Sequence, residues 1–84
     1  MTREEVAAVF ARALARIAPE ADLASVGPRD DLREALDLDS MDFLNLLVGV
    51  HEQTGIEIPE ADAPKLATLE GAAAYLAAWE PRRG

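Results

Sequence analysis

The stretch LDLDSMDFLNLL, residues 36–47, places a serine among acidic residues where an apolar run begins. Ser and Asp directly before an apolar run mark the start of a helix. Asp39 is therefore the expected N-cap, with Asp42 at the third helical position. Gly55 supplies a C-terminal stop. The stretch and its continuation predict a helix over residues 40–54.

This predicted helix is apolar around most of its circumference. Its apolar residues form a wide face: Phe43, Leu44, Leu46, Leu47, Val48 and Val50. Its polar stripe steps by three and four residues: Asp42, Asn45, Gly49 and Glu52. We expect it to be the most buried helix, with only this stripe and its N-terminus in water.

A first helix is predicted over residues 3–18. Thr2 and Glu5 form a T-x-x-E capping box. Pro19 ends the helix, because the residue before a proline avoids the α region. One apolar stripe recurs at helical spacing: Val6, Val9, Phe10, Ala13, Leu14 and Ile17.

The connections around the 40–54 helix contain shorter elements. DDLREAL, residues 30–36, favours a turn or two of helix, with Asp31 as its cap and Glu34 three residues later. Downstream, IEIP, residues 56–59, indicates an extended link, and ADAPKLA, residues 61–67, one short helical turn.

Thr68 is the expected cap of the last helix. The apolar face of this helix is Leu69, Ala72, Ala73, Leu76 and Ala77. Tyr75 and Trp79 lie near its edge, and Pro81 ends the ordered chain. The pattern predicts an all-α fold, a small bundle of three main helices plus one short helix.

Length and composition indicate a single domain over residues 1–84, with an ordered core over about 3–79. Half of the residues are hydrophobic, which is enough for a core. No run of apolar residues is long enough for a membrane span. The acidic, amphipathic start is not a signal peptide, so we expect a cytoplasmic protein that binds no membrane.

The charge is segregated along the chain. The formal net charge is −8, and residues 30–62 hold ten acidic residues against one base, Arg33. Such a region repels nucleic acid and attracts basic protein surfaces. Acidic residues that only keep a small protein soluble are the alternative interpretation.

The residue types present exclude several kinds of chemistry. The chain has no cysteine and one histidine, His51. Disulfides, thiolate nucleophiles and zinc-thiolate sites are therefore absent, and we expect no metal site. His51 is at the far end of the predicted 40–54 helix, where a histidine is favoured by the helix dipole. A role in pH-dependent loosening of that helix is the alternative.

Ser40 lies at the first turn of the 40–54 helix. A helix N-terminus offers free N–H groups and a partial positive charge, so it tolerates a phosphate ester. His51 is eleven residues further on, about 16 Å along the helix axis. Without a base, Ser40 is not an acyl-transfer nucleophile. It either helps to cap the helix or is an attachment point for a group brought by another enzyme.

LDLDSMDFLNLL resembles the phosphopantetheine-attachment motif of acyl carrier proteins, whose core is Asp-Ser-Leu. The resemblance extends over nearly the whole chain, with I-x-I-P and a Thr-capped helix downstream. It implies that Ser40 takes a 4′-phosphopantetheine arm through a phosphodiester, donated from coenzyme A by a phosphopantetheinyl transferase. The implied function is a non-catalytic, monomeric carrier. It would hold an acyl group as a thioester for partner enzymes of fatty-acid, polyketide or related biosynthesis.

The resemblance also implies roles for residues around Ser40. Asp39 would orient the transferase and its metal ion, and Met41 would give partners an apolar contact. Basic patches of partner enzymes would dock on Asp42, Asn45 and Glu52. An acyl-sheltering cleft between helices would be lined by Leu46, Val50, Ile58 and Leu66, although packing alone also predicts their burial.

The chain departs from the family pattern at several positions. Asp37 stands where glycine is frequent, so the loop before Ser40 lacks glycine's freedom at positive φ. Asn45, His51 and Gln53 stand where fatty-acid carriers tend to place acidic residues. These departures indicate a dedicated set of partners in a specialised pathway.

Two other functions are compatible with the residues. A phosphate on Ser40 would suit the same helix N-terminus and make the chain a phospho-regulated interaction module. An enzyme using Asp37 and Asp39 as a carboxylate pair is the other, although no other residue indicates a pocket for it.

Overall fold

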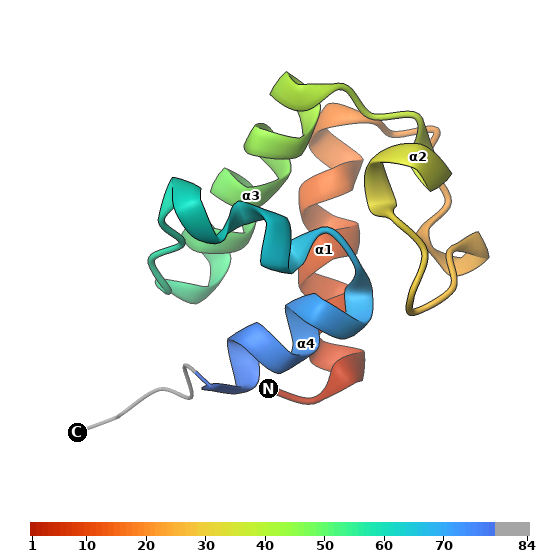
Figure 1. Ribbon diagram of the computed structural model, residues 1–84. Helices are drawn as coiled ribbons and strands as arrows, with labels where there is room; N and C mark the ends of the chain where they lie inside the picture. Colours follow the sequence, from red (N-terminus) through yellow and green to blue (C-terminus); the bar gives the residue numbers. More distant parts are fainter. Residues whose placement is uncertain (79–84) are drawn as a thin grey trace.

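Helix α1, Arg3–Ile17, lies at the centre of the fold in this computed structural model, which describes residues 1–78. Helix α3, Ser40–Thr54, packs along one side of α1, and α4, Leu69–Ala78, packs near its N-terminal end (Figure 1). The short helix α2, Leu32–Leu36, lies on the other side (Figure 1). This arrangement confirms the predicted all-α bundle of three main helices and one short helix.

The capping box predicted for α1 is present. The backbone N–H of Glu5 donates to Thr2 Oγ1 at 3.1 Å, and the backbone N–H of Thr2 donates to Glu5 Oε1 at 2.8 Å. The helix ends at Ile17, one residue earlier than predicted, and Ala18 forms its C-cap. The predicted stripe is buried except Ile17, which is half-buried: Val6, Val9, Phe10, Ala13 and Leu14 are in the core.

Helix α3 begins and ends at the predicted residues. Asp39 is its N-cap and accepts the backbone N–H of Asp42 at 2.8 Å. Gly55 adopts the left-handed conformation at φ 73°, and its N–H donates to the His51 carbonyl at 2.7 Å. The two capping residues therefore fix the length of the helix, as the sequence indicated.

The prediction that α3 is the most buried helix is wrong. Leu44 and Val48 are 41% and 51% exposed, so part of the wide apolar face lies in water. Gly49, assigned to the water-facing stripe, lies against α1 instead. A Cβ atom on Gly49 would come within 2.8 Å of Ala13 Cβ, so its lack of a side chain permits the close approach of the two helices.

The connection between α1 and α3 contains α2 and one element that was not predicted. A 3₁₀ helix, η1, spans Leu23–Ser25. In α2, Asp31 Oδ1 accepts the N–H of Arg33 at 2.9 Å, which confirms its predicted capping role. Asp37 then adopts the left-handed conformation at φ 57° without being a glycine. Asp is one of the few residues besides Gly that visit this region.

A second 3₁₀ helix, η2, spans Glu60–Leu66 and is longer than the single turn predicted there. It packs against α4. Two backbone hydrogen bonds of 2.8 Å tie this part of the chain to the α2 connection. Leu32 N–H donates to the Ala67 carbonyl, and Glu70 N–H donates to the Pro28 carbonyl.

Thr68 caps α4 as predicted, since its Oγ1 accepts the N–H of Gly71 at 2.9 Å. On the predicted apolar face, Ala72 and Leu76 are buried, but Ala77 is exposed and was wrongly assigned to the core side. Trp79 and Pro81 lie outside the described residues. No helix within residues 1–78 is both long enough and apolar enough to cross a membrane.

Candidate functional site at the start of α3

Ser40 is the first residue of α3 and is exposed. The preceding residue, Asp39, uses its carboxylate to cap the helix, so the Ser40 hydroxyl is not needed as the cap. N–H groups in the first turn of a helix have no intrahelical acceptor and carry partial positive charge. An exposed hydroxyl beside such groups is chemically suited to carry a phosphate ester.

The single histidine of the chain is not placed to act as a general base for Ser40. His51 lies in the last turn of α3, and its Nδ1 is 2.8 Å from the Ile56 carbonyl oxygen, to which it donates. Among residues 1–78, no group of three or more His, Cys, Asp or Glu side chains is placed to hold a metal ion.

The residues expected to dock partners lie along α3 and differ in their exposure to solvent and in their ion pairing. Met41 is 65% exposed, directly beside Ser40, while Asp42 is half-buried in the same turn. Asn45 and Glu52 are exposed further along the helix. Glu52 Oε1 is 4.0 Å from Arg16 Nη1 of α1, so part of its charge is already offset.

A groove of about 510 Å³ lies between α3 and the segment from Glu57 to Ala63. Its apolar wall consists of Leu44, Leu47, Val48, Ile58, Pro59 and Ala63. Polar side chains at its rim are His51, Glu57 and Glu60. Ser40, Leu44, Leu47 and His51 follow one another at helical spacing, so Ser40 faces the same side of α3 as the groove.

The sequence analysis expected a cleft lined in part by Ile58 but missed Leu44 and Val48 in its wall, because it assigned them to the core. A signal was available: Met41, Leu44 and Val48 recur at spacings of three and four, on the opposite side from Leu46 and Val50. A helix that is apolar on two sides has one side that its own core does not cover.

The four expected cleft residues are divided between two environments. Leu46, Val50 and Leu66 are fully buried in the core, while Ile58 is half-buried and lines the groove. The structure therefore does not bring all four together on one open surface.

On the far wall of the groove, η2 is joined to α4 through a carboxylate. Tyr75 Oη donates to Asp62 Oδ2 at 2.8 Å, and Lys65 Nζ is 3.4 Å from Asp62 Oδ1. The hydrogen bond from Tyr75 is the main cause that lowers the pKa of Asp62 below its ordinary value of 3.8. Desolvation is the next largest effect and opposes it by raising the pKa, and the hydrogen bond and charge of Lys65 each lower the pKa by a smaller amount.

Comparison with known proteins identifies the family. The profile of the phosphopantetheine attachment site matches residues 3–76. An acyl carrier protein of Helicobacter pylori is 30% identical over 73 residues, which are 87% of each chain. The chain belongs to the acyl carrier protein family. Further similar proteins are the acyl carrier proteins of Thermosynechococcus vestitus, 36% identical over 80% of this chain and 76% of the relative, and Rubrobacter xylanophilus, 38% identical over 66% and 68%.

Membership of the acyl carrier protein family implies a covalently attached 4′-phosphopantetheine and interaction with biosynthetic enzymes. The matched region contains both Ser40 and the groove beside it. An exposed serine at a helix N-terminus fits the covalent attachment of such a cofactor.

Proposed function

We propose that Ser40 carries the 4′-phosphopantetheine arm and that this chain presents acyl groups to enzymes of fatty-acid, polyketide or related biosynthesis. The observation that carries the proposal is the exposure of the Ser40 side chain at the first position of α3, inside the region that matches the family. When bound, the arm supplies a terminal thiol, which this cysteine-free chain lacks.

The attachment step requires a second protein. Ser40 Oγ attacks the phosphorus of coenzyme A that bears pantetheine, and an Oγ–P bond forms. The bond from that phosphorus to adenosine 3′,5′-bisphosphate breaks, and the hydroxyl proton passes to a base of the phosphopantetheinyl transferase. His51, about 16 Å further along α3, is too far from Ser40 to act as that base.

Docking of partners combines exposed charge with exposed apolar surface. Asp39 and Asp42 lie at the attachment end of α3, and the apolar ridge of Met41, Leu44 and Val48 runs from them along the groove. A fitting partner carries basic residues around an apolar contact. Electrostatic steering makes such complexes form rapidly, and small contacts let them dissociate readily. Both properties suit a monomeric cytoplasmic carrier that passes its cargo on.

The cargo is proposed to lie between the helices during transfer. Ile58 lines the groove, and Leu46, Val50 and Leu66 fill the core behind it. An acyl chain entering from the groove would displace contacts among these side chains, because protein cores hold few voids of that size.

Incubation with coenzyme A and a broad-specificity phosphopantetheinyl transferase tests the proposal by intact mass. We expect an increase of one phosphopantetheine unit in the wild type and none in Ser40→Ala. Ser25, the only other serine, is the matched control, since its hydroxyl already donates to the Asp22 carbonyl at 2.7 Å. Ser25→Ala should be modified like the wild type.

A failure of Ser40 to accept the arm would contradict the proposal. Incorporation of a bare phosphate at Ser40 by a kinase, with no acceptance of the arm, would favour the phospho-regulated module instead.

A further inference from the structure

Arg33 of α2 lies over the ring of Phe43 of α3. Its guanidinium carbon is 5.4 Å from the centre of the ring, within the range of a cation–π interaction. Phe43 is buried, whereas 47% of the Arg33 side chain is exposed. The buried ring thus lies below a guanidinium whose side chain is still about half exposed to solvent.

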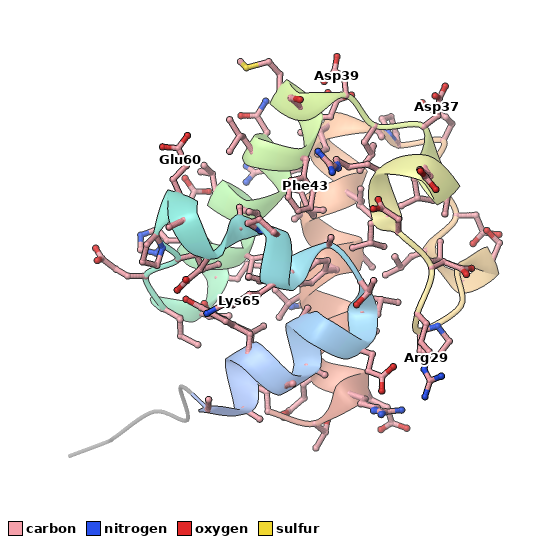
Figure 2. All side chains as sticks on the ribbon, viewed as in Figure 1. Arg29, Asp37, Asp39, Phe43, Glu60 and Lys65 are labelled. Carbon is pink, nitrogen blue, oxygen red and sulfur yellow. The ribbon has the colours of Figure 1, made fainter. Side chains whose placement is uncertain are left out.

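This contact places a positive charge near the first turn of α3. Phe43 follows Ser40 by three positions, and residues at that spacing are neighbours on a helix surface, with about 5–6 Å between their Cβ atoms. Figure 2 shows Phe43 one turn below Asp39, on the side of α3 that faces α2. The Leu38 N–H, two residues before Ser40, donates to the Arg33 carbonyl at 2.9 Å, so Arg33 lies near the attachment end of α3.

Within residues 1–78, the guanidinium makes no short ion pair. Among the described residues, its one ion-pair contact joins Arg33 Nε to Asp31 Oδ1 at 4.0 Å. That oxygen already accepts the backbone N–H groups of Arg33 at 2.9 Å and Glu34 at 3.4 Å, as the cap of α2. The planar fork of an arginine matches the geometry of a phosphate.

The local charge favours such a partner. A phosphodiester on Ser40 adds a negative charge near Asp37, Asp39 and Asp42, and like charges at short range repel. Arg33 is the only basic residue in the whole acidic stretch 30–62. We propose that Arg33, held by Phe43, is a positioning residue that binds the phosphodiester of the arm. This inference rests on the proposed attachment at Ser40.

The test compares the melting temperatures of two forms of the protein, without the phosphopantetheine arm (apo) and with it (holo), in three variants. Arg33→Gln removes the charge, and Arg33→Lys keeps the charge but loses the planar fork. Arg29→Gln is the matched control, because Arg29 lies at the opposite end of the molecule from Asp39 (Figure 2) and pairs with Glu70 at 3.0 Å. Intact mass confirms the holo form of each variant.

We expect Arg33→Gln to lower the melting temperature of the holo form by about 2–4 °C more than that of the apo form, the scale of one exposed ion pair in a domain of this size. In Arg33→Lys the extra fall in the melting temperature of the holo form should be smaller, because the charge is kept. Arg29→Gln should change the melting temperatures of both forms equally. The ³¹P resonance of the holo protein should also shift in Arg33→Gln and not in Arg29→Gln.

Equal losses in the apo and holo forms of Arg33→Gln, with an unshifted ³¹P resonance, would overturn the inference and leave Arg33 as a cover for Phe43. That result would leave the proposed function standing, because the mass increase measures attachment at Ser40 whether or not Arg33 binds the phosphodiester. A wild type that gains no mass would overturn both.

Discussion

Asp39 Oδ1 accepts a 2.8 Å hydrogen bond from the backbone N–H of Asp42, so the residue before Ser40 fixes the start of α3. We predict that Asp39→Ala lowers the free energy of unfolding by about 1 kcal/mol, the usual value of an N-cap. Asp39→Asn should cost little, since Asn caps a helix as well as Asp does. Urea denaturation measures both, and an Asn variant as unstable as the Ala variant would show that the charge, not the cap, stabilises the helix.

Asp39→Asn also separates the capping role of Asp39 from its proposed role in docking the transferase. If the charge of Asp39 orients the transferase, Asp39→Asn should fold normally but accept the arm more slowly than the wild type. The initial rate of mass increase measures this effect. An unchanged rate would limit Asp39 to its structural role.

Leu47 and Leu44 lie in neighbouring turns of α3 in different environments. Leu47 is 6% exposed and Leu44 is 41% exposed. Leu47→Ala should cost about 2–5 kcal/mol of unfolding free energy, because it removes a buried side chain. Leu44→Ala, the matched control, should cost within about 0.5 kcal/mol. A cost below about 0.5 kcal/mol for Leu47→Ala would mean that the core-facing side of α3 is assigned wrongly.

The hydrogen bond from Tyr75 to Asp62 gives the fold an acid-sensitive contact. Because the folded pKa of Asp62 is lowered, its contribution is complete above the ordinary value of 3.8 and is lost as the pH falls through the folded pKa. Tyr75→Phe should raise this pKa toward 3.8 and weaken the pH dependence of stability below about pH 4. Carboxyl ¹³C titration by NMR measures the pKa directly.

Lys65→Gln provides the comparison, since Lys65 has the smaller influence on Asp62. It should raise the Asp62 pKa less than Tyr75→Phe does. The reverse order would contradict the assignment of the Tyr75 hydroxyl as the main cause.

The acidic stretch 30–62 should make stability depend on salt. Between about 0.01 M and 0.1 M salt the screening length falls from about 30 Å to about 10 Å, so mutual repulsion weakens and the melting temperature should rise. Glu57→Gln, inside the stretch, should raise the low-salt melting temperature more than Glu20→Gln, outside it; both positions are exposed. A melting temperature that does not change with salt would argue against repulsion as a destabilising force.

Capping chemistry made the ends of the helices predictable from sequence. Thr2, Asp31, Asp39 and Thr68 each accept the expected backbone hydrogen bond, and Gly55 adopts the expected positive φ. These signals are local, because each cap involves residues at most four positions apart. Local chemistry also located Ser40 at the first turn of α3.

Tertiary packing accounts for what the sequence did not indicate. The sequence analysis treated the apolar residues of α3 as one wide face, whereas the packing of α3 leaves Leu44 and Val48 exposed. In the sequence Gly49 falls among the polar positions of α3. Only the structure shows that Ala13 of α1 lies against it. Asp37 shows that a loop can use positive φ without glycine, at an energetic cost that only the surrounding contacts can offset.

Isolation of the protein from its native host, followed by fragmentation mass spectrometry, tests the central claim most directly. We predict that the peptide containing Ser40 carries phosphopantetheine, with an acyl group in thioester linkage on the ejected arm. An unmodified Ser40 in every fraction, or the arm on Ser25 instead, would contradict it.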